Sequence, residues 1–210
     1  MIEAKNNRDF LLNDCRIVEP KAFDDALEAI VTALQAGGRI YVCGNGGSAS
    51  DAEHIVGELG KSFEMDRPID SRLLEALSQF GKKGALLSKK LEAGIPAFSL
   101  NSQISLISAI GNDIGFPYVF AQQIATYGRA GDVLICISTS GNSENVVLAA
   151  ITAKAKALSV VSLTGRDGGE LRSLSDYCIR VGLIRTAAIQ EKHIMIYHLL
   201  CREIESRCLS

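Results

Sequence analysis

The sequence predicts an α/β protein in which a doubly wound, five-stranded parallel sheet is flanked by helices on both faces. The main observation is that segments with apolar residues three or four positions apart alternate with short, β-rich apolar runs. A second observation is that glycine-rich turns follow several of these runs. In an open parallel sheet, ligands bind at the carboxyl ends of the strands. We therefore expect the functional site at that edge.

Five short apolar runs are the predicted strands. They are Arg39–Cys43, Ala97–Leu100, Asp132–Ser138, Ser159–Leu163 and Tyr177–Val181. Four longer segments have the apolar spacing of amphipathic helices. They span residues 23–37, 48–63, 144–157 and 187–206. The alternation of the two kinds of segment is what favours a parallel sheet with crossover helices.

One segment, Ile69–Ile95, departs from this alternation. It contains two helical patterns split by Gly81 and Gly84, and lysines stand at positions 82, 83, 89 and 90. We interpret it as an inserted helical hairpin. It is either a solvated surface excursion or subunit contact, or a segment whose lysines bind a second anionic group at an active site.

The composition indicates one domain, spanning residues 1–210, because 210 residues that are 47% hydrophobic suffice for one core. The net charge of −2 offers no patch for nucleic acid or an acidic membrane. Six scattered cysteines form no CxxC pair, and neither a signal peptide nor an apolar run long enough to span a membrane is evident. We expect a cytoplasmic protein that acts on a small molecule.

The sequence GNGGSASDAEH follows the first predicted strand and opens a helix, with Ser48 or Ser50 as the expected cap. Such a turn exposes backbone N–H groups at the positive end of a helix, where an anion or a sugar hydroxyl can be held. Glycines also serve turn geometry alone, and the spacing fits neither the dinucleotide fingerprint nor the P-loop.

The sequence STSGNS ends the third predicted strand and precedes a helix. Its four hydroxyl side chains exceed what a helix cap requires, and they predict a neutral cradle for a phosphate monoester. The hydroxyls belong to Ser138, Thr139, Ser140 and Ser143.

The chain has three histidines, and two of them stand in pairs at helical spacing. His54 and Glu58 are four positions apart, and Gln190 and His198 are eight apart, so each pair shares a helix face. Together they could supply ligands to one divalent metal ion, most plausibly zinc, although a His/Glu pair at this spacing is also a common surface interaction. His193 lies on another face and is interpreted as a structural or supporting residue.

Six motifs occur in the order and approximate spacing found in phosphoheptose isomerases, and the chain therefore resembles that family of the sugar isomerase (SIS) fold. The motifs are GNGGS, DAEHIVGE, GNDIGF, ISTSGNS, LTGRDGG and IQEKHIMIYH. The resemblance covers roughly residues 20–205, apart from the insertion. It implies a homotetramer with active sites at subunit interfaces. It also implies conversion of sedoheptulose 7-phosphate into D-glycero-D-manno-heptose 7-phosphate, for bacterial surface glycans such as lipopolysaccharide.

The resemblance assigns roles residue by residue. It places substrate contacts on Asn45, Gly46, Gly47, Ser48, Glu58, Asn112, Asp113, Ser138, Thr139, Ser140, Ser143 and Gln190. It places one zinc ion per subunit on His54, Glu58, Gln190 and His198. With Glu58 as the base and His198 as the acid, a proton would move between adjacent carbons through a cis-enediol, while the metal stabilises the developing charge.

Two departures from the family pattern keep alternatives open. About 25 extra residues follow Arg67 and Pro68, and Lys61 and Ser62 stand where the family tends to place an arginine. The insertion leaves room for a different sugar phosphate. The rival class is a non-catalytic SIS protein that binds a partner, such as the bacterial DnaA initiator-associating protein. Because that class replaces the carboxylate and the late histidine, the presence of Glu58 and His198 favours the enzyme.

Overall fold

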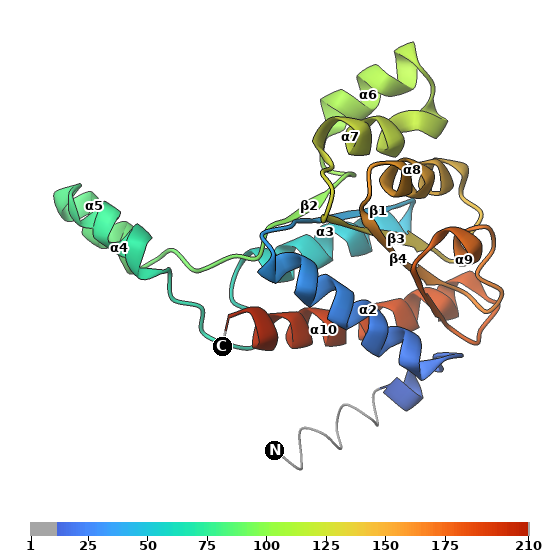
Figure 1. The fold of residues 1–210 in the computed structure, drawn as a ribbon, viewed down its shortest axis with the longest axis horizontal. Coiled ribbons are helices and arrows are strands. Elements are labelled where there is room, and N and C mark those ends of the chain that lie inside the picture. Colours follow the sequence, from blue (N-terminus) through green and yellow to red (C-terminus); the bar gives the residue numbers. More distant parts are fainter. Residues whose placement is uncertain (1–11, 210) are drawn as a thin grey trace.

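The structure, a computed structural model, describes residues 12–209 and contains a five-stranded sheet with the strand order β2-β1-β3-β4-β5 (Figure 1). The strands are β1 (Ile40–Gly44), β2 (Ala97–Ser99), β3 (Val133–Ser138), β4 (Ser159–Thr164) and β5 (Tyr177–Arg180). Every pairing between them is parallel. The predicted class, sheet and strands are confirmed.

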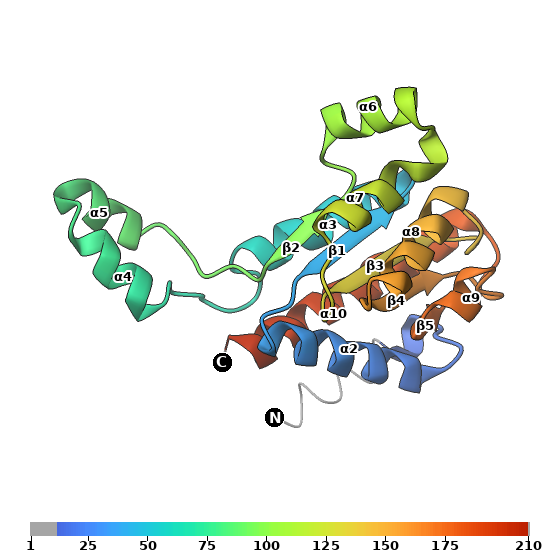
Figure 2. The same cartoon turned by 45° about the horizontal axis from the view of Figure 1, so that its top comes forward.

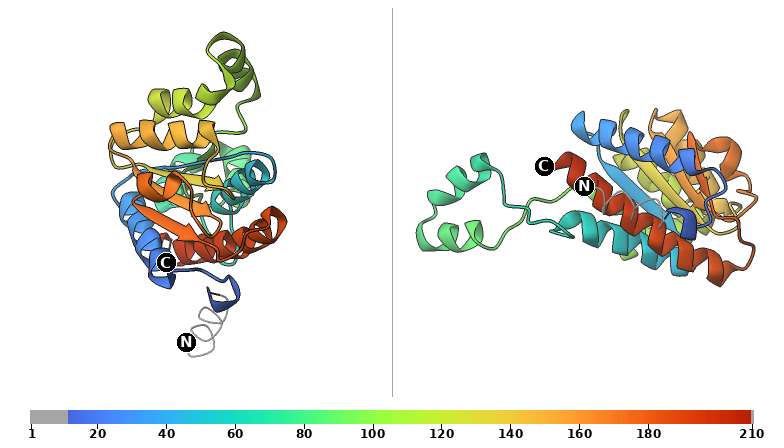
Figure 3. Two further views of the ribbon diagram at one scale, coloured as in Figure 1. Left: turned by 90° about the vertical axis from the view of Figure 1, so that its right-hand side faces the viewer. Right: turned by 90° about the horizontal axis from the view of Figure 1, so that it is seen from below.

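Helices cover both faces of the sheet (Figure 3). One face carries α2 (Pro20–Gln35), α3 (Gly47–Gly60) and α10 (Thr186–Cys208). The other carries α6 (Ile104–Asp113), the 3₁₀ turn η1 (Phe116–Tyr118), α7 (Val119–Tyr127), α8 (Glu144–Ala155) and α9 (Leu171–Leu174). Successive strand residues point to opposite faces, so β1 sends Ile40 and Val42 into one core and Tyr41 and Cys43 into the other.

The segment Ile69–Ile95, called the arm below, contains α4 (Ser71–Ser78) and α5 (Gly81–Ser88). The two helices lie close because Gly84 has no side chain, and a Cβ there would stand 1.8 Å from the carbonyl oxygen of Leu77. Figures 1 and 2 show the arm projecting away from the sheet. Its apolar side chains are largely exposed, Phe80 by 69% and Leu86 by 60%. Within the described residues, α4 and α5 therefore pack chiefly on each other, whereas the base of the arm joins the body of the protein through Ile95.

The strand order places the two polar loops of interest next to each other. The chain leaves β1 for β2 on one side, whereas β3 lies on the other side of β1. The carboxyl ends of β1 and β3 thus flank the point where the strand order reverses, which is where open α/β sheets bind ligands. Within residues 12–209, no helix combines the length and apolar character needed to cross a membrane.

Candidate active site

The loops after β1 and β3 are joined by a pair of asparagines. Nδ2 of Asn45, directly after β1, donates to Oδ1 of Asn145 over 2.7 Å, and Nδ2 of Asn145 donates back to Oδ1 of Asn45 over 2.9 Å. Asn145 lies in the first turn of α8. This reciprocal pair holds the glycine-rich turn against the helix that follows STSGNS, so both loops face one edge of the sheet.

The glycine-rich turn brings α3 and α10 into close approach. Gly46 has a φ of 58°, the left-handed region that favours glycine. A Cβ on Gly47 would lie 2.5 Å from Nε2 of Gln190, so only glycine leaves space for the amide of α10. The predicted residues of this turn are therefore in contact with the predicted Gln190.

The expected cap of α3 is wrong. The helix begins at Gly47, so Ser48 and Ser50 lie within it, and no side chain caps its first turn. Backbone carbonyls satisfy the first amides instead, since N–H of Ser48 donates to the carbonyl of Asn45 and N–H of Ala49 donates to that of Gly46. The turn conformation itself, which glycine permits, replaces the cap. Ser48 is buried at 3% exposure.

The STSGNS loop gathers its hydroxyl groups. Oγ of Ser138 lies 3.1 Å from Oγ of Ser143 and 3.5 Å from Oγ of Ser140, and it accepts a hydrogen bond from N–H of Gly141. Ser143 directly precedes α8, but its side chain makes no cap hydrogen bond. These hydroxyls stand together at a helix N-terminus, an arrangement suited to a phosphate.

Thr139 opens onto a neighbouring cavity of about 260 Å³, which Ser140 and Arg166 also line. Arg166 comes from the LTGRDGG motif, and its Nε donates to Oδ1 of Asp167 over 3.2 Å. A guanidinium beside hydroxyl groups is suited to a phosphate dianion. Arg166 is not among the predicted site residues, and its place just after a predicted strand is the sequence signal that points to it.

A second cluster joins the predicted base and the predicted acid. On α3, Nε2 of His54 lies 3.1 Å from Oε1 of Glu58. The ring of His198 on α10 meets the ring of His54 edge to face, with centroids 5.0 Å apart. Nζ of Lys61 lies 3.3 Å from Oε2 of Glu58. This lysine therefore places a positive charge beside Glu58, in the region where the resemblance leads us to expect an arginine. Glu58 and His198 thus belong to one cluster.

Tyr197 and Asp51 support His54 from the protein interior. The hydroxyl of Tyr197 lies 2.8 Å from Nδ1 of His54, and Tyr197 is 1% exposed. Burial, with the charge of Asp51 next, raises the pKa of the Tyr197 phenol well above its usual value. Burial also raises the pKa of the Asp51 carboxyl, while Tyr197 and His54 oppose that shift. Neither residue was predicted, because their contact requires α3 and α10 to pack.

The imidazole of His198 is predominantly neutral at neutral pH. Burial lowers its pKa and the nearby His54 lowers it further, whereas the carboxylates of Glu58 and Glu64 act in the opposite direction. A neutral imidazole carries one N–H donor and one acceptor nitrogen, so it can both give and take a proton. This is the requirement for a group that moves a proton between two oxygens.

The predicted zinc ligands are only partly brought together within one chain. His54, Glu58 and His198 offer two imidazoles and a carboxylate, which suit zinc. Gln190 lies against Gly47, and eight residues of helix separate it from His198 by about 12 Å. The amide of Gln190 thus lies at the glycine-rich turn. Among residues 12–209, no three His, Cys, Asp or Glu side chains already stand in metal-binding positions.

Asn112 and Asp113 lie apart from both clusters. They end α6, and their side chains are exposed and bonded to each other, with Nδ2 of Asn112 donating to Oδ1 of Asp113 over 2.7 Å. Figures 1 and 2 place α6 on the outer side of α7, far from α10. The structure therefore does not bring these two predicted substrate contacts to the rest of the site within one chain.

Asn101 and His193 contact backbone carbonyls at the ends of β1 and β4. Nδ2 of Asn101, just after β2, donates to the carbonyl of Gly44 over 2.8 Å and so braces the end of β1. His193 is fully buried, and its Nε2 lies 3.3 Å from the carbonyl oxygen of Thr164 at the end of β4. Burial lowers the pKa of His193 to about 4. His193 is thus buried on another face of α10, as expected for a structural residue.

Comparisons with known proteins agree with this arrangement. The SIS domain family model matches residues 11–94 and 91–165. A phosphoheptose isomerase of Rhodospirillum rubrum is 38% identical over 199 residues, covering 95% of this chain and 90% of that protein. One from Methylibium petroleiphilum is 38% identical over 217 residues, covering 100% and 96%.

A solved structure gives the same result. A phosphoheptose isomerase from Francisella tularensis matches with a TM-score of 0.76 and 33% identity, covering 98% of this chain and 94% of that one. The chain belongs to the SIS domain family and, within it, to the phosphoheptose isomerases.

Proposed function

We propose that this protein is an aldose-ketose isomerase that converts sedoheptulose 7-phosphate into D-glycero-D-manno-heptose 7-phosphate. The observation that carries the proposal is the cluster in which Glu58 of α3 and His198 of α10 both meet His54. Its relatives bear the name phosphoheptose isomerase. A non-catalytic binding protein would have no need for a carboxylate and a neutral imidazole in one cluster.

The reaction needs two proton transfers, and the cluster has a group for each. Glu58 removes a proton from C1 of the ketose and returns it to C2, which forms the aldose through a cis-enediol. His198, neutral at neutral pH, donates its N–H proton to the carbonyl oxygen and takes one from the neighbouring hydroxyl. No oxidant or reductant is consumed, because the hydrogen leaves one carbon and joins the next.

The STSGNS hydroxyls and Arg166 are the proposed phosphate contacts. Oγ of Ser138 lies 3.5 Å from Oγ of Ser140 and 3.1 Å from Oγ of Ser143. Holding the remote phosphate there fixes the reacting carbons against the acid and the base. Asn45, Gly46, Gly47 and Ser48 would bind the sugar at the neighbouring turn.

We further propose one zinc ion per subunit, held by His54, Glu58 and His198. Bound there, it would polarise the oxygens of the substrate and stabilise negative charge on them. The amide of Gln190 lies beside Gly47 within the chain, and we propose that it joins the ion from a neighbouring subunit.

The same separation favours a homo-oligomer, for which we propose the tetramer of the family. The glycine-rich turn lies near Gln190, whereas the acid and base lie about two helical turns away, so the phosphate loop of one subunit would face the cluster of another. Asn112 and Asp113, remote within one chain, would reach a neighbour in the same way. We propose a cytoplasmic enzyme of heptose synthesis for surface glycans, consistent with six free cysteines.

The test is turnover of a panel of ketose phosphates by the zinc-loaded protein, followed by NMR. We expect aldose from sedoheptulose 7-phosphate, and deuterium from the solvent incorporated at C2 of the product. Turnover of another member alone would replace the substrate but keep the reaction class. Binding of the panel without any aldose or deuterium exchange would exclude the isomerase.

A further inference from the structure

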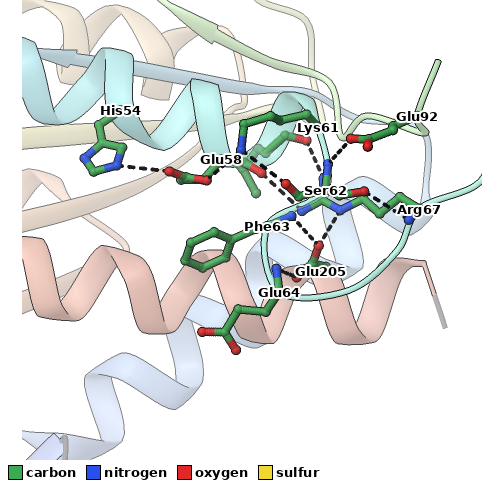
Figure 4. A network of polar contacts seen from close by, with 10 residues as sticks. His54, Glu58, Lys61, Ser62, Phe63, Glu64, Arg67, Glu92 and Glu205 are labelled. Carbon is green, nitrogen blue, oxygen red and sulfur yellow. Dashed lines mark hydrogen bonds and ion pairs between the residues drawn. The ribbon is translucent and has the colours of Figure 1, made fainter. Parts of the chain in front are cut away.

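A buried ion pair stands where the helix of the proposed base ends. Nε of Arg67 lies 2.6 Å from Oε1 of Glu205, and their side chains are 1% and 0% exposed. Figure 4 shows this pair at the centre of a network that reaches Glu58 and His54. Arg67 belongs to the loop after α3, and Glu205 to the last turns of α10. We call the pair the clamp.

Arg67 holds the end of α3. Its Nη1 donates to the carbonyl of Leu59 over 2.7 Å, and its Nη2 donates to the carbonyl of Glu58 over 3.1 Å. Carbonyls in the last turn of a helix have no partner within the helix, so a guanidinium can satisfy several of them. The backbone of the proposed base is thus fixed directly by Arg67.

Glu205 holds the loop that follows α3. Its two carboxylate oxygens accept hydrogen bonds from N–H of Phe63 and N–H of Glu64, each over 2.9 Å. The ring of Phe63 packs against the ring of His198, with centroids 5.8 Å apart. His198 precedes Glu205 by two helical turns on α10, so both residues share a face. One carboxylate therefore connects α10 to the loop that touches the proposed acid.

The chemistry of the clamp favours positioning over stability. Burying two charges is costly, and replacing such a pair with well-packed apolar side chains is often neutral for stability. The polar pair instead fixes the relative position of two segments, because Arg67 binds carbonyls at the end of α3 and Glu205 binds N–H groups of the loop that follows. We propose, on the basis of the proposed isomerase activity, that Arg67 and Glu205 are positioning residues that set the separation of Glu58 from His198.

The arm is anchored at the same point. N–H of Ala93 donates to the carbonyl of Arg67 over 2.8 Å, and N–H of Ile95 donates to that of Leu59 over 2.8 Å. N–H of Ser62 donates to the carboxylate of Glu92 over 2.7 Å. The base of the arm and the clamp therefore contact the same end of α3.

The test replaces the pair by apolar side chains of similar size, Arg67→Met together with Glu205→Leu, in the full-length protein. We expect a lower melting temperature, because four backbone groups lose their partners, but a protein that is folded at the assay temperature. In that protein we expect a KM within about twofold and a kcat reduced about 10- to 100-fold, the loss that a small misplacement of reacting groups causes. A matched control is Arg207→Met with Glu28→Leu, which removes a more exposed pair that joins α10 to α2. We expect unchanged kinetics in the control.

Two results would overturn the proposal: an unchanged kcat in the double variant, or an equal loss of kcat in the control. If the double variant does not fold, Arg67→Lys replaces it. We expect the same fall in kcat at a nearly unchanged KM, because an ammonium cannot hold the carboxylate and both carbonyls at once. Hydrogen exchange gives a readout without turnover. We expect faster exchange at residues 57–64 and unchanged exchange at the start of α3. Unchanged exchange throughout would refute the clamp, whereas an inactive wild type would refute only the proposed function.

Discussion

Nε2 of His54 stands 3.1 Å from Oε1 of Glu58, one helical turn along α3. The other ring nitrogen faces the hydroxyl of Tyr197 over 2.8 Å. Tyr197 also hydrogen-bonds the carboxyl group of Asp51, so the two residues together fix the orientation of the His54 ring. Nε2 of His54 and the carboxylate of Glu58 thus face the same space, as two ligands of the proposed zinc ion would.

Glu58→Gln keeps the shape of the side chain but removes the proton acceptor. We expect kcat to fall about 10²- to 10⁴-fold, the usual contribution of a positioned acid or base, with little change in KM. His198→Asn should give a loss in the same range. The measurement is initial rates by NMR. Glu53→Gln, an exposed carboxylate of the same helix, is the control and should keep full activity.

Zinc content should depend on His54. We expect about one zinc ion per subunit by elemental analysis of the wild type, and a loss of most of it in His54→Ala, because the variant lacks one of the imidazole ligands. His193→Gln is the matched control among the histidines, since that residue is buried away from the cluster. Equal zinc content in His54→Ala and the wild type would refute this ligand.

Ser143→Ala tests the phosphate cradle with little structural disturbance, because its Oγ contacts Oγ of Ser138 and makes no cap hydrogen bond. A hydrogen bond to a charged group contributes about 1.5 to 3 kcal/mol, so we expect KM to rise at least tenfold. We expect kcat to stay within about twofold, since the acid and base are untouched. Ser173→Ala, at α9, should change neither constant. A fall in kcat at unchanged KM would contradict the assignment.

The stability of the protein should fall in mild acid because of His193. Its pKa is lowered to about 4 in the folded protein, whereas an unfolded chain has the ordinary value of 6.5. Between these values the unfolded state binds the proton first, so the free energy of unfolding decreases as the pH falls from 6.5 to 4, by about 3 kcal/mol in total. Urea unfolding at several pH values measures this. His193→Gln should flatten that dependence, and an equal slope in both proteins would contradict it.

The sequence predicted what depends on local pattern. Short apolar runs determine the strands, and the four-residue spacing of His54 and Glu58 determines their contact on α3. The spacing of Gln190 and His198 indicated their shared face of α10, but the position of the Gln190 amide beside Gly47 depends on how α10 packs on α3. The partners of Arg67 and Asp51 lie more than 130 positions away, on α10, so only the packing of the helices reveals them.

Removal of the arm tests the alternatives that the sequence left open. Pro68 and Glu92 form an antiparallel bridge at its base, so residues 70–91 can be replaced by one glycine without moving the flanking backbone. Since α4 and α5 project away from the sheet of their own chain (Figure 2), we expect kcat/KM to change by less than about tenfold, or about 1.4 kcal/mol.

The control for this deletion replaces the four arm lysines, at positions 82, 83, 89 and 90, with glutamine. If the lysines served an active site, both proteins would lose activity equally, most of all toward sugars with a second anionic group. A loss above about 100-fold in the deletion alone, together with a smaller assembly in light scattering, would instead identify the arm as a subunit contact on which the site depends. Retained activity in both proteins would identify the arm as a solvated surface segment that takes no part in the reaction.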